Sequence, residues 1–159
     1  GQPFAKRGKR TDEMLELMRE LWQPGWREFN GEFYQMPRLE MTPTPPHIPI
    51  YGGGLSDIAL RRAARLDGWI GDLISLDQAI ERVDKLRALR AEKGMTMDDF
   101  TVLTPLTDAF TIPHYERAAA AGIDYILTMP WMFYSGPDCS LADKIDGMRR
   151  FRKDLALDD

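Results

Sequence analysis

The chain has 159 residues, one domain's length and enough to bury a core. Its composition, 43% hydrophobic and 29% charged, is typical of a globular protein. The net charge of −4 disfavours nucleic acid as a partner, because phosphate binding needs a clustered basic surface. No apolar run approaches the roughly 18 residues of a membrane span. Cys139 has no second cysteine to pair with, which favours a cytoplasmic protein. From the charge and the hydropathy we expect neither nucleic-acid nor membrane partners.

The N-terminal part of the chain predicts a helix followed by a β-hairpin. Thr11 is expected to be the N-cap of the helix, and Pro24-Gly25 is expected to end it. One apolar face recurs at helical spacing, formed by Met14, Leu17, Met18, Leu21 and Trp22. Asn30-Gly31, between residues 26–29 and 32–34, is a strong signal for a hairpin turn. Four prolines predict an extended, irregular stretch behind it: Pro37, Pro43, Pro45 and Pro46.

After residue 43 the pattern alternates between strands and helices. The predicted strands are residues 48–51, 69–70 with an extension to 74, 100–103 and 123–129. The predicted helices are 56–67 closed by Gly68, 76–93 closed by Gly94, 113–121 closed by Gly122, and 141–157. This alternation predicts parallel strands with crossover helices. Four such units in residues 43–159 fit half of a (β/α)₈ barrel of roughly 250 residues, and the alternative is an open, doubly wound sheet.

The most informative segment is a strand that runs through three glycines into a helix, Gly52-Gly53-Gly54-Leu55-Ser56. Glycines let a ligand approach the backbone closely, because no Cβ is in the way. A helix N-terminus offers free N–H groups and a positive dipole end, which suit a phosphate. The alternative is a plain strand-to-helix turn in which Ser56 only caps its own helix. The residues by themselves leave these two interpretations equally open.

Several segments in a fixed order resemble the C-terminal part of a known family. They are Arg7-Gly8-Lys9-Arg10-Thr11-Asp12-Glu13, Phe29-Asn30-Gly31-Glu32-Phe33-Tyr34, Pro45-Pro46-His47-Ile48-Pro49-Ile50, Gly52-Gly53-Gly54-Leu55-Ser56 and Arg61-Arg62-Ala63-Ala64-Arg65-Leu66-Asp67-Gly68-Trp69-Ile70. Together they resemble the luciferase-like monooxygenase family, the flavin- and deazaflavin-dependent barrel oxidoreductases. Residues 71–159 agree with that family in strand–helix pattern but contain no sharp motif.

The resemblance implies an α/β fold, half of a TIM-type (β/α)₈ barrel, in which residues 1–159 form a single domain. Residues 1–42 would be a helix and hairpin insertion, and residues 43–159 four βα units. The implied function is part of an oxidoreductase or monooxygenase acting on a small organic substrate, with FMN or a deazaflavin coenzyme of the F-420 type. The turn would hold the cofactor phosphate through Gly53, Gly54, Leu55 and Ser56. No residue is assigned a catalytic role.

Other candidate residues carry weaker signals. Five follow predicted strands, on the face where barrel active sites lie: Asp72, Thr104, Thr107, Asp108 and Trp131. Trp69 is expected to fill the core, and Cys139 to be an ordinary thiol. His47 and His114 have no partner at metal-ligand spacing, so we predict no metal site, and we expect His114 to be exposed. Asp67 is expected to form a local cap or ion pair.

The family's barrels have four further βα units ahead of the part that this chain resembles. We therefore expect either a C-terminal fragment or a half-barrel that pairs with itself or with the missing N-terminal half. The outer strands would lie near residues 48–51 and 123–129. A non-catalytic half-barrel that binds a phosphorylated ligand or a partner chain is the alternative function. A different phosphate-binding barrel enzyme is disfavoured, because no lysine nucleophile lies at a strand end.

Overall fold

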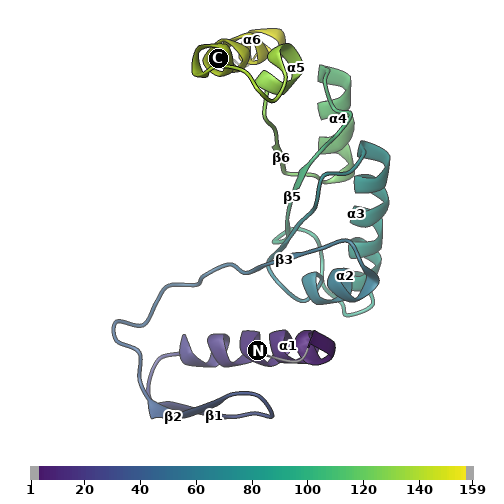
Figure 1. The fold of residues 1–159 in the computed structure, drawn as a ribbon. Helices are drawn as coiled ribbons and strands as arrows, with labels where there is room; N and C mark the ends of the chain where they lie inside the picture. Colours follow the sequence, from purple (N-terminus) through teal and green to yellow (C-terminus); the bar gives the residue numbers. More distant parts are fainter. Residues whose placement is uncertain (1–3, 157–159) are drawn as a thin grey trace. The chain divides into compact units, whose positions relative to one another are not determined.

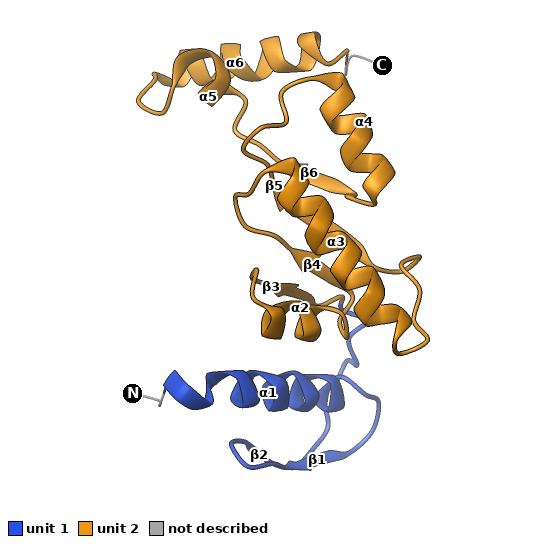
Figure 2. Cartoon of the chain, turned by 90° about the vertical axis from the view of Figure 1, so that its right-hand side faces the viewer, with its two compact units in different colours: residues 1–48 blue, residues 49–159 orange. Residues whose placement is uncertain are grey.

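The computed structural model describes residues 4–156 of the chain. It divides into two compact units, Gly1–Ile48 and Pro49–Asp159, which are coloured separately in Figure 2. None of the helices within residues 4–156 is both long enough and apolar enough to cross a membrane.

Unit 1 contains a helix and a two-stranded antiparallel sheet (Figure 1). Its elements are the 3₁₀ turn η1 Phe4–Lys6, α1 Arg7–Leu21, β1 Arg27–Asn30 and β2 Gln35–Leu39. The prediction that Thr11 caps the helix is wrong, because α1 begins four residues earlier, after Lys6. The Thr11 hydroxyl instead donates a hydrogen bond to the Arg7 carbonyl inside the helix, at 2.9 Å. The basic residues that precede Thr11 therefore extend the helix.

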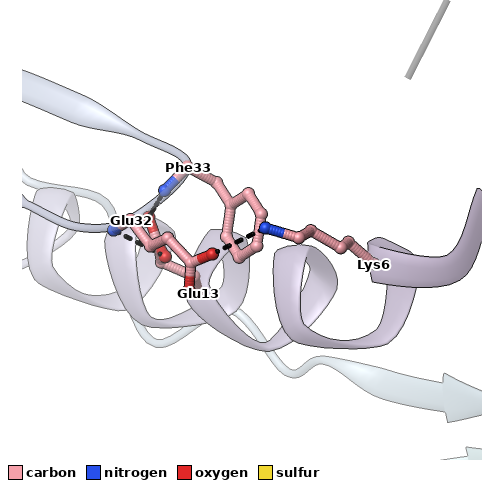
Figure 3. Close-up of polar contacts among 4 residues, drawn as sticks. All are labelled: Lys6, Glu13, Glu32 and Phe33. Carbon is pink, nitrogen blue, oxygen red and sulfur yellow. Dashed lines mark hydrogen bonds and ion pairs between the residues drawn. The ribbon is translucent and has the colours of Figure 1, made fainter. Parts of the chain in front are cut away.

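The hairpin is confirmed, but its turn is longer than the Asn-Gly signal predicts. Phe29 and Met36 are partners, as are Asn30 and Gln35, so residues 31–34 form the connection. A half-buried carboxylate, that of Glu13, accounts for this length (Figure 3). Glu13 of α1 accepts backbone N–H bonds from Glu32, Phe33 and Tyr34, at 3.0, 2.7 and 2.7 Å. These charge-assisted bonds replace the ladder bonds that a two-residue turn would form.

A proline lies inside the second strand of the hairpin, although the sequence predicts irregular structure from that residue onward. The pairing register shifts between Arg27 and Phe29, which leaves Pro37 and Arg38 opposite the single residue Glu28. Proline lacks the N–H that a regular ladder requires, and a bulge is where a strand tolerates it. Residues 40–50 form no helix or strand, which confirms the irregular stretch beyond β2.

Unit 2 is built on a parallel sheet with the strand order β3-β4-β5-β6 (Figure 2). The strands are β3 Tyr51–Gly53, β4 Gly68–Ile70, β5 Thr101–Pro105 and β6 Tyr125–Leu127. The helices are α2 Asp57–Ala63, α3 Leu76–Ala91, α4 Ile112–Ala121, α5 Trp131–Ser135 and α6 Leu141–Asp154. Each strand pairs with the next along the chain, as in a segment of a barrel, and the order never reverses as it does in a doubly wound sheet. The sheet formed by the described residues is not closed.

The two faces of this sheet differ. Alternate residues on one face are buried, among them Trp69, Val102 and Thr104, which are 0% exposed. Trp69 and Val102 belong to a hydrophobic core with residues of α2, α3 and α4, including Leu60, Ala63, Ala79, Val83, Leu86 and Ala118. The residues in between lie on the other face, where Ile70, Tyr125 and Leu127 are 39%, 61% and 52% exposed. One face is therefore a packed core, and the other is an open apolar surface.

The element types of unit 2 follow the predictions, while several boundaries differ. The first strand begins at Tyr51 and includes two of the three glycines, rather than ending before them. Helix α2 ends at Ala63, so the prediction that Gly68 closes it is wrong. Gly68 lies in β4, where an added Cβ would be 2.5 Å from the Thr101 carbonyl oxygen. A side chain there would clash with the neighbouring strand.

Later boundaries differ in the same way. Ile74 does not extend β4 but forms an isolated bridge to Leu106. The fourth strand, predicted for residues 123–129, is confined to residues 125–127. The short helix α5 has no counterpart in the sequence-based prediction. Residue 157, the predicted end of the last helix, lies outside the described residues. Gly122 is confirmed as the residue that closes its helix, because it is the C-cap of α4 with a φ of +91°. Gly94 also has a positive φ, of +66°, but α3 ends earlier than predicted, at Ala91.

Two aspartates tie adjacent strands together at their amino ends. The Asp67 carboxylate accepts the Ile50 N–H at 2.8 Å, while the Asp67 N–H donates to the Ile50 carbonyl at 2.9 Å. The Asp124 carboxylate repeats this pattern with the Val102 N–H at 2.7 Å, and its N–H donates to the Val102 carbonyl. This confirms a local capping role for Asp67. The glycine turn after β3 lies at the opposite, carboxyl edge of the sheet.

Candidate functional site

The glycine turn lies at the carboxyl end of β3, between that strand and α2. Gly52 faces α2 so closely that an added Cβ would be 2.8 Å from the Ala63 backbone. Gly54 has a φ of +107°, a conformation that other residues rarely adopt. Gly53 differs from both, because an added Cβ would meet no atom closer than 3.9 Å. Close packing against α2 therefore requires a glycine at position 52, and the positive φ requires one at position 54. At Gly53 neither constraint applies, and the missing side chain leaves an open space.

Ser56 is the N-cap of α2, as predicted. Its Oγ accepts the Ala59 N–H at 3.3 Å, and its carbonyl accepts the Leu60 N–H at 2.9 Å. The hydroxyl proton of Ser56 remains available as a donor, because the cap uses only an oxygen lone pair. The first-turn N–H groups of Asp57 and Ile58 have no acceptor within the helix, and both residues are exposed. Ser56 and the first turn of α2 thus offer several donors to a ligand at this edge.

Trp69 connects the core to the glycine turn. Its side chain is 0% exposed, which confirms the prediction of core filling. Its indole N–H donates a hydrogen bond of 2.9 Å to the Gly54 carbonyl. Because a buried indole is fixed in place, this bond holds the turn at the residue with positive φ. Trp69 therefore holds the turn in position from the core side of the sheet.

One acidic residue stands in the first turn of α2. Asp57 forms an ion pair with Lys85 of α3, and this hydrogen bond lowers the pKa of the Asp57 carboxyl below its ordinary value. The carboxylate is exposed, so its field is screened by solvent. The lysine offsets a negative charge that would otherwise repel an anion at the helix N-terminus.

The remaining candidates at strand ends are not brought together into one site. Asp108 accepts the Leu76 N–H at 2.8 Å, which fixes the start of α3. Asp72 accepts the N–H of its neighbour Leu73. Thr104 is fully buried on the helix-covered face, and Trp131 begins α5, which packs against Gly147 of α6. Of the five, Thr107 lines a hollow at the carboxyl edge.

The histidines play no joint role. His114 is partly buried rather than exposed, because its Nδ1 accepts the Phe110 N–H at 3.2 Å at the start of α4. His47 is exposed and belongs to unit 1. Within residues 4–156, no three His, Cys, Asp or Glu side chains gather in a group that could hold a metal ion.

An apolar hollow of about 490 Å³ lies at the carboxyl ends of β5 and β6. Its lining residues come from the ends of these strands, from the segment after β4 and from α5: Leu73, Pro105, Leu106, Thr107, Leu127, Thr128, Met129, Met132 and Phe133. Sequence reasoning misses the contribution of α5, because five residues are too few to show a helical period. The apolar run Trp131-Met132-Phe133-Tyr134 after Pro130 is the signal that could have indicated it.

The chain is similar in sequence to one protein family and to curated proteins of about twice its length or more. The sequence model of the family described as luciferase-like monooxygenase matches residues 1–137. An uncharacterized protein of Mycobacterium tuberculosis is 42% identical over 98% of this chain and 54% of its own length. The pyrimidine monooxygenase RutA of Allorhizobium ampelinum is 33% identical over 66% of this chain and 30% of its own length. The chain thus spans about half the length, or less, of these curated relatives.

Two solved structures share the fold. The EDTA monooxygenase EmoA from Chelativorans sp. BNC1 superposes with a TM-score of 0.53 and 22% identity, over 99% of this chain and 46% of its own. DmoA from Hyphomicrobium sulfonivorans has the same TM-score with 20% identity, over 65% of this chain and 28% of its own.

Proposed function

Because the chain belongs to the luciferase-like monooxygenase family, we propose that it is part of a flavin- or deazaflavin-dependent oxidoreductase acting on a small organic substrate. The relatives named above include monooxygenases of small organic molecules, which supports this substrate class. In this proposal residues 1–159 form the C-terminal part of one barrel. When bound, the cofactor supplies a hydride or activated oxygen, and the protein binds and orients it.

The turn Gly53–Ser56 is proposed to hold the cofactor phosphate. The observations that support this role are the open space at Gly53 and the donors that follow in the same strand-to-helix connection: the Ser56 hydroxyl and the N–H groups of Asp57 and Ile58. A phosphate there would receive hydrogen bonds from backbone and hydroxyl donors at the positive end of a helix. Gly54 and Trp69 would keep these donors in place.

A comparison of FMN with riboflavin tests this role, because the two differ only in the phosphate. FMN and an F-420-type coenzyme should each bind more tightly than their dephosphorylated forms. Gly53→Ala should abolish this preference while leaving thermal stability unchanged, since its Cβ enters ligand space and touches no protein atom closely. Ser75→Ala removes the N-cap of α3, away from this turn, and should leave the preference for the phosphorylated form unchanged. Equal binding of FMN and riboflavin by the wild-type chain would refute the proposal.

We further propose that the open sheet face is covered by another set of strands, either the N-terminal half of a barrel or a second copy of this chain. Ile70, Tyr125 and Leu127 are exposed there, and β3 and β6 are the outer strands of the sheet. Exposed apolar surface next to unpaired strand edges favours association. Sedimentation should show a dimer at micromolar concentration. A stable monomer that binds no apolar dye would contradict this association.

The same surface favours a second candidate function, a non-catalytic half-barrel that binds a phosphorylated ligand or a partner chain. In that case phosphate binding at the turn would persist, and mixing with the N-terminal half of a relative would give no turnover.

A further inference from the structure

The apolar hollow described above lies at the carboxyl ends of β5 and β6. It is on the same edge of the parallel sheet as the Gly53–Ser56 turn, since parallel strands all end there. Two to three strand spacings, about 10–14 Å, separate β3 from β5 and β6 along that edge. This distance leaves room for a ring system between a phosphate at the turn and a second ligand in the hollow.

The hollow has a definite chemical character. None of its nine described lining residues is charged, and Thr107 and Thr128 provide its two side-chain hydroxyls. A charged group that lost its water there would gain no counter-ion from these residues, at a large cost in free energy. A neutral apolar molecule would replace ordered water by contact with Leu, Met and Phe side chains.

One wall of the hollow is an element that the βα repeat does not require. Helix α5 lies between β6 and α6, and it contributes Met132 and Phe133 to the hollow. Phe133 is held by an edge-to-face contact with Phe110, with ring centroids 4.9 Å apart. Met132, by contrast, is 37% exposed and has an unbranched, flexible side chain. The wall is thus fixed at one residue and adaptable at the other.

We propose that this hollow binds a neutral, predominantly apolar organic substrate with at most one or two hydrogen-bonding groups. The substrate class rests on the proposed function, while binding in the hollow is independent of it. The hollow adjoins the open sheet face through Leu127, which belongs to both, whereas Ile70 and Tyr125 of that face do not line the hollow.

The test uses prodan, a neutral naphthalene fluorophore, as the reporter ligand of the purified chain. Neutral naphthylmethanol should displace it, and naphthalene disulfonate, which has the same ring system with two negative charges, should not. Met132→Lys should weaken prodan binding by about tenfold or more and gain affinity for the disulfonate, because it places a cation in the hollow. Leu73→Lys, in the loop after β4, should have the same two effects, because Leu73 also lines the hollow. This second variant provides the test if Met132→Lys does not fold.

Two lysine variants outside the hollow are matched controls. Met148→Lys lies on α6, and Ile70→Lys on the open sheet face; both residues are about as exposed as Met132, at 44% and 39%. Neither should change prodan binding. Unchanged binding in Met132→Lys and Leu73→Lys, or an equal loss in Ile70→Lys, would overturn the proposal.

FMN and riboflavin titrations of the same variants separate this inference from the proposed function. If prodan behaves as expected while FMN and riboflavin bind equally, the hollow stands as a neutral-ligand site and the cofactor proposal fails. If FMN is preferred but the charge variants leave prodan unaffected, the hollow fails as a site and the cofactor proposal stands.

Discussion

Ser56→Ala removes a hydroxyl that has two roles in the proposed turn. As an acceptor, it caps α2 through a long bond of 3.3 Å to the Ala59 N–H, so its loss should cost about 0.5–1 kcal/mol. In a unit of this size that cost lowers Tm by about 2–4 °C. As a donor, the hydroxyl would bond a phosphate oxygen, worth about 1.5 kcal/mol. FMN affinity should therefore fall about tenfold, while riboflavin affinity should not change.

The chain offers matched controls for separating the two roles. Ser75 and Ser140 cap α3 and α6 by the same kind of bond, to the Gln78 and Asp143 N–H groups. Ser75→Ala and Ser140→Ala should lower Tm similarly and leave FMN binding unchanged, and Ser56→Thr should restore both properties. Circular dichroism measures Tm, and quenching of flavin fluorescence measures affinity. If Ser56→Ala affects FMN no more than Ser75→Ala does, the phosphate role is refuted.

Four further predictions follow from the structure. Glu13→Ala should destabilise unit 1 by about 2–3 kcal/mol in denaturant titration, because three backbone N–H groups lose a charged acceptor; a loss below 0.5 kcal/mol would contradict this. Trp69→Phe should cost about 1–3 kcal/mol and reduce the preference for FMN over riboflavin, whereas an unchanged preference would remove Trp69 as a positioning residue. Hydrogen bonds from the Ser140 hydroxyl and N–H lower the pKa of the Asp143 carboxyl below its ordinary 3.8, so the stability that these two bonds add should be present above pH 3.8 and lost as the pH falls through the lowered pKa. An Asp143 carboxyl that titrates at 3.8 or above by NMR would contradict this prediction. The chain alone should not turn over substrate with reduced flavin or deazaflavin, and activity should appear only after mixing with the N-terminal half of a relative, because catalysis needs a complete, water-excluding site.

The sequence predicts the element types of unit 2 because each depends on local chemistry. Ser56 and Pro113 mark helix starts by capping and by fixed φ, and Gly122 marks a stop by positive φ. Boundaries that depend on tertiary contacts are missed. A glycine at position 68, after a helical pattern, predicts the end of a helix. In the structure Gly68 lies in β4, where a glycine is required because the Thr101 carbonyl oxygen leaves no room for a side chain. The hairpin turn is longer than Asn30-Gly31 predicts because the acceptor that organises it, Glu13, lies far away in the sequence.

The same distinction applies to the candidate site. The glycine turn is continuous in sequence, so residues 52–56 suffice to indicate it. The hydrogen bond from Trp69 to Gly54 joins residues from adjacent strands, and no local pattern encodes it. The apolar hollow combines residues from three connections and one short helix, so it emerges only once the parallel strands are placed side by side.

Backbone amide NMR of the ¹⁵N-labelled chain during titration with FMN tests the central claim most directly. The account predicts that the largest shifts fall on Gly53, Gly54, Ser56, Asp57 and Ile58, and that riboflavin leaves these amides unmoved. Shifts centred instead on the N-termini of α3 or α6, or identical shifts with riboflavin, would contradict a cofactor-phosphate site at this turn.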